Sequence, residues 1–445
     1  MSLIRQSGQT LLWQIAGFLA AAVSGMLTAR VLGPADRGLL AAVYLYPQLA
    51  ATLGSLSLGV AIFHRLSRGT FSLQEFAGTC AAASGGLGAI SLLVLLFSVW
   101  LGGEPLHRGI PWSLLLLTLL PLPCLFSLGL FSSLLQGAMD IGWYNLVNQG
   151  SKLLSLLVVL GLLALGRLRV WDLAVAGAVL TAMTGLLPVW RLHRHAPGAW
   201  RIRGDLFRSL LADGLRVHLG SIAIFLAARA NLFLANAFLP KAEVGYLYMA
   251  VTLAELVWFI SVAAETVLYP QVAHMTEEEA AILTARVCRQ ILILSVLSGL
   301  ALAVLAPAAV LLYGGRAFLP AVTPLRLLLP GIVVLTISKI LSALWVRRGW
   351  FLMLTVLAGG TGVLSIVLNL FLIPWLGIAG AALATTIPYL VNAGISLWIY
   401  RCRISRDVGM VWRVRWQDLV HLARSLTGRP PSWNGPVLPS EVKLP

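Results

Sequence analysis

The polar side chains that could do chemistry in this sequence stand inside long apolar segments. Four of them recur at intervals of three and four residues between positions 141 and 165, and so lie on one face of a helix. They are Asn145, Asn148, Lys152 and Ser155. Amide, hydroxyl and ammonium groups hydrogen-bond phosphate and sugar oxygens. This spacing therefore predicts a polar stripe that faces a cavity.

A second stripe runs along the segment from 210 to 238. On a helical wheel its members fall within about 40° of one another. They are His218, Phe225, Arg229 and Asn236. Because ionisable groups inside a membrane span usually face a cavity or a partner, both stripes are expected to face one shared interior. For His218, a hydrogen-bonded packing role is the alternative to proton transfer.

Two consecutive apolar segments carry four ionisable side chains, which form two pairs at matching depths in the membrane. Arg229 lies nine residues from the outer end of the first segment and Glu255 lies eleven from the outer start of the second, a depth difference of roughly 3 Å. Arg216 and Glu265 lie at matching depths near the inner ends. We therefore predict an ion pair at each depth. The two pairs either take part in ion coupling or only hold the two helices together.

Two lysines lack an acidic partner within their own apolar segments. Lys152 lies eleven residues into its segment, about 16 Å from the cytoplasmic end, and is expected to face a cavity and bind an anion. Lys339 lies nearer the end of its segment, where a lysine can also extend its ammonium group to the membrane surface. The candidate substrate-binding residues are therefore Lys152, Arg229, Arg216, Lys339, Asn145, Asn148 and His218, and the candidates for ion pairing or coupling are Glu255 and Glu265.

The elements that carry these residues are membrane spans. Of the 445 residues, 59% are hydrophobic and only 11% are charged, and the mean hydropathy is +0.90, which excludes a soluble globular protein. Uncharged stretches long enough to cross a membrane supply eight spans, the last two of which are joined by a turn at residues 373–377. The charged apolar segments add four more, at about 141–165, 210–238, 244–272 and 321–345. The sequence thus predicts twelve helices.

Lysine and arginine are distributed asymmetrically between the predicted loops. With the N-terminus inside, 20 of the 32 Lys and Arg residues fall on the cytoplasmic side and seven fall on the other side. Cytoplasmic loops of membrane proteins are enriched in Lys and Arg, so both termini are predicted to be cytoplasmic. The same rule explains the net charge of +16 without a nucleic-acid partner.

The chain contains an internal repeat. When it is shifted against itself by 207 residues, Gly38 meets Gly245, and the same shift brings Trp143 onto Trp350. Six spans per half is an even number, so both halves start on the same side of the membrane and the repeat is parallel. We therefore expect an all-α polytopic membrane protein of two six-helix bundles around a central cavity. The expected parts are an N-terminal bundle at 1–192, a basic cytoplasmic linker at 193–209, a C-terminal bundle at 210–400 and a cytoplasmic or interfacial tail at 401–445.

Motifs for soluble chemistry are missing from the sequence. It has no phosphate-binding loop and no nucleophile elbow, and no metal-ligand spacing is found among Cys80, Cys124, Cys288 and Cys402. No metal, cofactor or ATP site is therefore expected, and any pumping must use an ion gradient or the gradient of the substrate. An intramembrane enzyme that modifies a lipid-linked glycan is an alternative. Such enzymes generally need acidic clusters in an outer loop, and the predicted outer loops are short.

A family resemblance begins at the loop after the first predicted span. This loop reads Thr28-Ala29-Arg30-Val31-Leu32-Gly33-Pro34-Ala35-Asp36-Arg37-Gly38. It closely resembles the corresponding loop of the oligosaccharide flippase, or polysaccharide transporter, family. That family belongs to the multidrug/oligosaccharidyl-lipid/polysaccharide (MOP) exporter superfamily. The resemblance runs in order from about residue 8 to residue 400. Later signatures of that family resemble Val244-Gly245-Tyr246, Leu268-Tyr269-Pro270-Gln271-Val272-Ala273, Tyr313-Gly314 and Ile373-Pro374-Trp375-Leu376-Gly377-Ile378-Ala379-Gly380-Ala381-Ala382-Leu383-Ala384-Thr385.

The resemblance implies a flippase of the bacterial inner membrane that works by alternating access. Its implied substrate is an oligosaccharide or polysaccharide repeat unit linked to undecaprenyl pyrophosphate, and its implied partners are membrane lipids, polysaccharide polymerase and glycosyltransferases. At Asn231 many relatives carry an acidic residue, so the coupling ion stays open. The alternative is a multidrug or small-solute exporter of the same superfamily. Drug exporters often use a carboxylate in the first helix, and the first predicted span has none.

Overall fold

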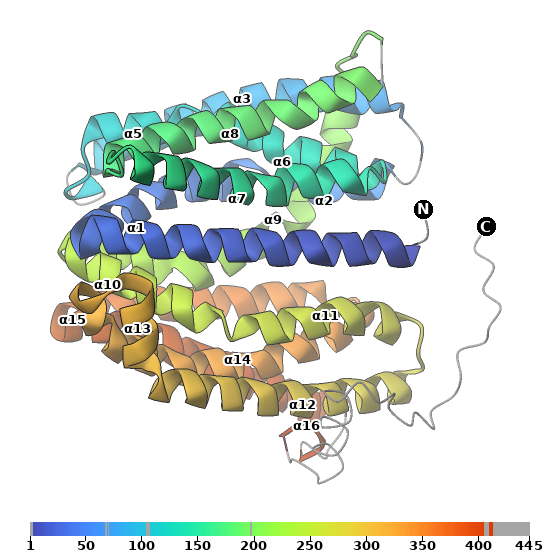
Figure 1. Ribbon diagram of the computed structural model, residues 1–445. Coiled ribbons are helices and arrows are strands. Elements are labelled where there is room, and N and C mark those ends of the chain that lie inside the picture. Colours follow the sequence, from blue (N-terminus) through green and yellow to red (C-terminus); the bar gives the residue numbers. More distant parts are fainter. Residues whose placement is uncertain are drawn as a thin grey trace.

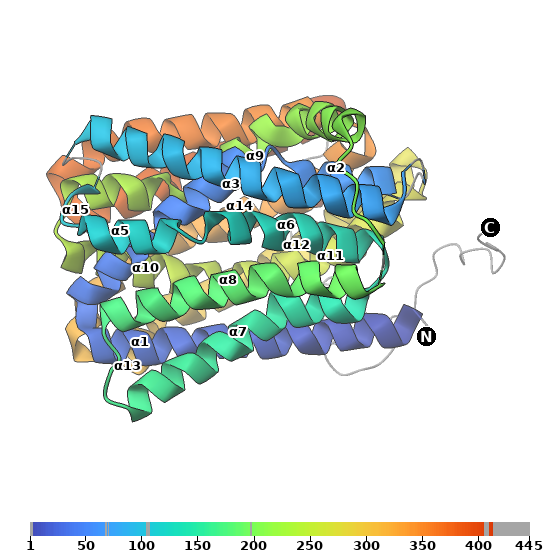
Figure 2. The ribbon, with the colours of Figure 1, turned by 90° about the horizontal axis from the view of Figure 1, so that it is seen from above.

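The computed structural model describes residues 3–66, 69, 71–103, 107–195, 198–404 and 409–412 of the chain. All regular elements within these ranges are helices (Figure 1). Most of them run side by side along one axis, with the N-terminal half of the chain on one side and the C-terminal half on the other (Figures 1 and 2). The start of α1 (Leu3–Gly54) and the last turns of α15 (Phe351–Arg403) lie at the same end of this axis, which we call the inner end after the orientation that the sequence predicts.

In the N-terminal half the helices are α1 (Leu3–Gly54), α2 (Leu58–Leu66), α3 (Leu73–Gly102), α5 (Trp112–Leu119), α6 (Leu122–Gly137), α7 (Ile141–Ala164) and α8 (Val170–His195). In the C-terminal half they are α9 (Gly204–Phe238), α10 (Lys241–Glu255), α11 (Trp258–Ala273), α12 (Glu277–Val304), α13 (Ala306–Gly314), the 3-10 helix η1 (Arg316–Ala321), α14 (Val322–Arg347), α15 (Phe351–Arg403) and α16 (Gly409–Trp412). Of the predicted tail, residues 405–408 and 413–445 lie outside the described ranges.

The helices α1 and α15 each contain two spans. Gly33 has a φ of 73° and Gly377 has a φ of 58°, a left-handed conformation that glycine adopts without steric cost, and the helical geometry is interrupted at both. Nine of the described helices are long and apolar enough to cross a membrane, or ten when α10 and α11 are taken as one bent span. Dividing α1 and α15 at their glycines brings the total to twelve, so the predicted number of spans is confirmed.

The parallel repeat is also confirmed. Gly38 and Gly245, which the shift of 207 residues superimposes, touch across the interface between the halves: a Cβ built on Gly38 would lie 2.7 Å from the Gly245 nitrogen and 1.8 Å from the Lys241 carbonyl oxygen. The third and ninth spans, α3 and α12, begin with equivalent capping boxes, built on Ser72 and Thr276. These two capping boxes are 204 residues apart, three fewer than the shift, and they start corresponding spans of the two halves.

Each half packs its own apolar core. Phe131 and Leu134 are fully buried in the N-terminal half, and Phe318 and Trp345 are fully buried in the C-terminal half. Large apolar side chains are exposed on the outside of both halves, as expected for helices that face lipid.

Two spans are broken without a proline at the break. The second span changes from α1 to α2 at Leu56 and Ser57, whose φ values of 47° and 52° are unusual for residues with a side chain. The eighth span bends by 42° between α10 and α11. Both breaks change which face of the span the following residues present, and the second one decides an ion pair described below.

Candidate functional site

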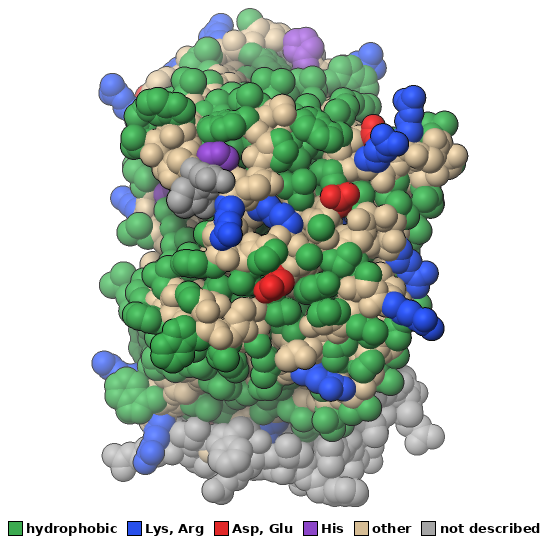
Figure 3. All heavy atoms as spheres, turned by 90° about the vertical axis from the view of Figure 1, so that its left-hand side faces the viewer, with side chains coloured by type: hydrophobic (Ala, Val, Ile, Leu, Met, Phe, Trp, Pro, Cys, Tyr) green, Lys and Arg blue, Asp and Glu red, His purple; other side chains and the backbone are tan. Residues whose placement is uncertain are grey.

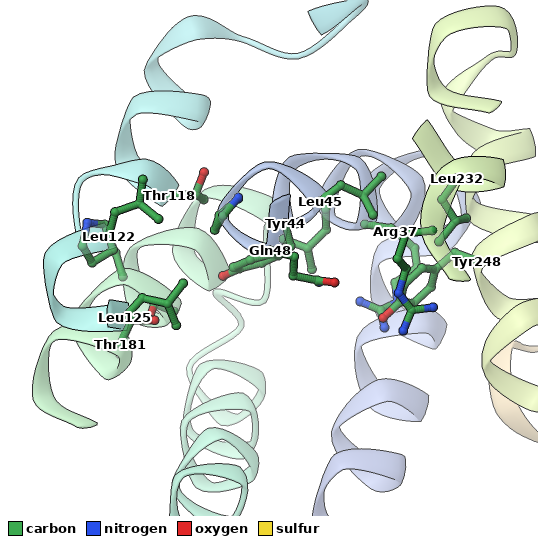
Figure 4. Close-up of a pocket in the computed structure, with 17 residues that line it drawn as sticks. Arg37, Tyr44, Leu45, Gln48, Thr118, Leu122, Leu125, Thr181, Leu232 and Tyr248 are labelled. Carbon is green, nitrogen blue, oxygen red and sulfur yellow. The ribbon is translucent and has the colours of Figure 1, made fainter. Parts of the chain in front are cut away.

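A cavity of about 330 Å³ lies between the two bundles. Helices α1, α5, α8, α9 and α10 supply its polar lining, which consists of Arg37, Tyr44, Gln48, Thr118, Thr181, Arg229 and Tyr248. Figure 4 shows Arg37 beside Tyr248 at one end of this cavity and Thr181 near Leu125 at the other. The combination of cations, hydroxyl groups and an amide suits a polar anionic ligand.

A second cavity, of about 290 Å³, lies within the N-terminal bundle. Lys152 and Ser155 of α7 face Ser24 and Thr28 of the first span across it. The lining residues common to both cavities are Arg37, Leu40, Tyr44 and Gly177. The two cavities therefore adjoin: Arg37 lines both, Arg229 lines only the first and Lys152 lines only the second.

The predicted stripe on α7 has two parts: some of its residues pack against neighbouring helices, and the others line the second cavity. Asn145 donates a hydrogen bond to the Thr10 hydroxyl at 2.9 Å, and Asn148 donates one to the Ser132 hydroxyl at 3.2 Å. These two amides join α7 to its neighbours. The Lys152 ammonium group donates to the Gln149 amide oxygen at 2.9 Å, and no carboxylate in the described part of the chain forms an ion pair with it.

Arg229 and Glu255 form the predicted ion pair. The Nη1 atom of Arg229 lies 3.0 Å from Oε1 of Glu255, and their side chains are 30% and 28% exposed. The contact is confirmed, and it joins α9 to α10 at the wall of the larger cavity. Because Glu255 neutralises Arg229, this pair adds no net charge to the cavity.

The second predicted pair is wrong. Arg216 is 79% exposed and lies 3.6 Å from Asp213, three residues earlier on α9, whereas Glu265 lies 3.9 Å from the Nζ atom of Lys339 on α14. Depth counted along a straight helix does not fix the face that a side chain presents once the span bends. The bend of 42° between α10 and α11 precedes Glu265, which meets α14 rather than α9.

Two further candidates have partners outside the cavities. Lys339 lies in no part of either cavity lining, and its ammonium group also sits 5.3 Å from the centre of the Trp258 ring. His218 is buried, with Nδ1 3.3 Å from the Ser57 hydroxyl of the second span. The position of His218 matches the packing alternative.

Arg37 was missed as a site residue, because the sequence places it in an outer loop. The left-handed turn at Gly33 instead starts the second span at once, so Arg37 belongs to its first turns and points inward. Its spacing from Tyr44 and Gln48 follows one face of a helix, and this was the signal available in the sequence. Figure 3, a view of the outer end, shows more Lys and Arg than acidic side chains on this face.

Within the described residues, no group of three or more His, Cys, Asp or Glu side chains is placed to hold a metal ion. The site is therefore defined by its cations and neutral polar groups.

We predict that Arg229 and Glu255 are energetically coupled. Removing either partner leaves the other without its counter-ion in a membrane span, so Arg229→Ala and Glu255→Ala should each destabilise the protein. The double variant should be less destabilised than the sum, with a coupling of about 1 kcal/mol. Thermal denaturation of the purified variants measures the cycle. Strict additivity of the two effects would contradict the coupling.

The sequence of this chain matches the family model described as "Polysaccharide biosynthesis protein" over residues 3–276, more than half of its length. The chain belongs to the polysaccharide biosynthesis protein family. A comparison with curated proteins finds no match. The family assignment therefore rests on the match to the sequence model of this family.

Solved structures show that this polysaccharide biosynthesis protein has the MOP fold. The lipid II flippase MurJ in an inward closed conformation is 14% identical, and the match covers 94% of this chain and 93% of that chain with a TM-score of 0.75. A multidrug resistance transporter of the MATE family, in an inward-facing conformation, is 16% identical over 87% of this chain and 94% of that chain, with a TM-score of 0.74. An outward-facing structure from that transporter family gives 0.63 at 16% identity, over 90% of this chain and 94% of that chain.

The long apolar helices and the fold make this polysaccharide biosynthesis protein a multi-pass membrane protein with the fold of the MOP transporters. Two of these structural neighbours are named as a lipid II flippase and a multidrug resistance transporter.

Proposed function

We propose that this chain is a flippase that carries an oligosaccharide or polysaccharide repeat unit, linked to undecaprenyl pyrophosphate, across the bacterial inner membrane by alternating access. The observation that carries the proposal is the pair of adjoining cavities that contain Arg37 and Lys152, neither of which has an ion-pair partner among the described carboxylates. Two cations in a membrane protein need counter-charge, and a diphosphate supplies it.

The residues that line the two cavities have different proposed roles in binding the substrate. Lys152 supplies a compact positive charge and Arg37 a planar fork of donors, and both suit diphosphate oxygens. The neutral groups Tyr44, Gln48 and Thr181 line the larger cavity and suit sugar hydroxyl groups. The isoprenoid chain stays in the surrounding lipid, since neither cavity is wholly apolar.

The relatives support this substrate class. The family is described by polysaccharide biosynthesis, and one structural neighbour is named as a flippase of lipid II, which is that protein's own substrate. Glycosyltransferases must then supply the lipid-linked unit on the inner leaflet, and a polymerase or a further transferase must consume it on the outer leaflet.

The test is a deletion strain complemented with the wild-type gene. Lipid-linked saccharide should accumulate on the cytoplasmic leaflet of the deletion strain, and the cell-surface polysaccharide should disappear. Complementation should restore both. An unchanged surface polysaccharide, with no accumulated intermediate, would overturn the proposal.

The alternative function is export of drugs or small solutes, which the match to a multidrug resistance transporter favours. That function predicts that the deletion strain becomes more sensitive to cationic drugs while its lipid-linked saccharides stay normal. Two positive charges in the cavities argue for an anionic cargo instead.

We predict that both termini are cytoplasmic. A reporter fused after Gly102, at the end of α3, should report the outer side, and one fused after Arg203, just before α9, should report the cytoplasm, because the loops on the predicted cytoplasmic side hold most of the Lys and Arg residues. A cytoplasmic signal from the Gly102 fusion would refute the orientation.

A further inference from the structure

Arg37 lies where the two cavities meet, directly beneath the outer end of the protein. It lines both cavities, and its neighbour in sequence, Gly38, lies in the close crossing of the second and eighth spans. The crossing is reciprocal, because a Cβ built on Gly245 would lie 2.1 Å from the Pro34 carbonyl oxygen. We call this crossing the outer gate, since the two backbones are in contact there, next to the residue that both cavities share.

Arg37 contacts the opposite bundle through two tyrosines. Its guanidinium carbon lies 4.8 Å from the centre of the Tyr248 ring of α10, and its side chain hydrogen-bonds the hydroxyl of Tyr313 in α13. Tyr313 in turn reaches the first span, where a Cβ on Gly25 would lie 2.0 Å from its hydroxyl oxygen. A single cation of the N-terminal bundle thus holds two side chains of the C-terminal bundle.

These contacts are weaker than the one that an anion would offer. A guanidinium over an aromatic ring is held by the ring quadrupole, whereas a phosphate accepts two charge-assisted hydrogen bonds from the same group. An anion in the adjoining cavities therefore competes for Arg37 with Tyr248 and Tyr313.

We propose that Arg37 couples anion binding to the outer gate. A diphosphate that binds beside Lys152 draws the guanidinium away from the two tyrosines, and the outer gate loses contacts that hold the bundles together next to Gly38. Binding of cargo thereby favours opening toward the outer side. This inference rests on the proposed function, because it assigns a second role to a residue of the same site.

The experiment measures the outer-end distance in the full-length protein, purified in detergent. Spin labels are attached at Leu165→Cys and Ala317→Cys, two exposed outer positions in opposite bundles, after Cys80, Cys124, Cys288 and Cys402 are replaced. Inorganic pyrophosphate is the probe, and its binding is measured separately by calorimetry. In the otherwise unchanged protein, pyrophosphate should increase the population with the longer distance.

Three variants separate the coupling role from a merely structural one. Tyr248→Leu should raise the open-to-closed ratio about two- to thirtyfold without pyrophosphate, because the cation–π contact is lost. Arg37→Gln should do the same and should abolish the further response to pyrophosphate, and Arg37→Lys should restore part of that response. Arg108→Gln is the matched control. Arg108 donates to the carbonyl oxygens of Ala237 and Phe238 across the interface but lines neither cavity, so this variant should still respond to pyrophosphate.

The outcomes distinguish the two proposals. If Arg37→Gln keeps the full pyrophosphate response, the coupling role is overturned while the flippase proposal stands. If the unchanged protein binds no pyrophosphate at all, the diphosphate site itself is wrong.

Discussion

Replacing Lys152 by glutamate is expected to abolish glycan export. The ammonium group lies in a cavity of about 290 Å³ beside Arg37, and its only hydrogen-bond partner among the described residues is the neutral Gln149. A carboxylate there would repel the diphosphate that the cavity is proposed to hold. Lys152→Gln should also lose export, because it removes one of the two uncompensated charges, whereas Lys152→Arg should retain part of it.

The measurement is surface polysaccharide in the deletion strain, at equal membrane levels of each variant. Arg326→Gln is the matched control, since Arg326 is another cation within a span but donates to the Ala303 carbonyl oxygen and lines neither cavity. Export should survive this change. Normal export by Lys152→Glu would contradict the assignment of Lys152 as a diphosphate-binding residue. A low membrane level of all three Lys152 variants would indicate a structural role.

Gly38→Leu is expected to stop transport by a different route, because it prevents the outer gate from closing. The new Cβ would lie 1.8 Å from the Lys241 carbonyl oxygen, a backbone atom that cannot move aside as a flexible side chain can. Overpacking of this kind costs about 1–3 kcal/mol, which shifts the equilibrium between closed and open toward open by a factor of about 5 to about 160. A transporter that cannot close its outer end cannot complete the alternating cycle.

Labelling from the outside detects the expected state. Thr181→Cys, in the larger cavity, should react faster with a membrane-impermeant maleimide when Gly38→Leu is present. Gly86→Leu in α3 is the control, because a Cβ at Gly86 would meet no atom within 4 Å. Unchanged labelling together with normal export by Gly38→Leu would show that this crossing is not the gate.

The order and number of spans could be predicted because they depend on local properties of the chain. A stretch of apolar residues either is or is not long enough to cross the membrane, and the shift of 207 residues is visible in the sequence alone. The pairing of Arg229 with Glu255 followed for a similar reason, since α9 and α10 run back along each other from a short connection and Glu255, the last residue of α10, still precedes the bend. Little bending separates them, so depth was a sufficient guide.

The polar stripe on α7 predicted only part of the site. Spacing placed Asn145, Asn148 and Lys152 on one face, but a helix face about 100° wide can touch two neighbours and a cavity at once. Asn145 and Asn148 meet Thr10 and Ser132, and only the part of the stripe at Lys152 and Ser155 reaches open space. Which part of a face is filled by a neighbour depends on the angles between helices, and these are not encoded in spacing.

By itself the sequence determined a membrane protein of twelve spans in two parallel repeats, with an excess of cations on one side and a lysine without a partner at mid-depth. The tertiary structure alone decided that Glu265 meets Lys339 rather than Arg216, and that Arg37 belongs to the site. The physical reason is the same in both cases. A bend of 42° in the eighth span and a left-handed glycine at position 33 rotate every residue that follows, and only the packing of the two bundles fixes where those side chains end.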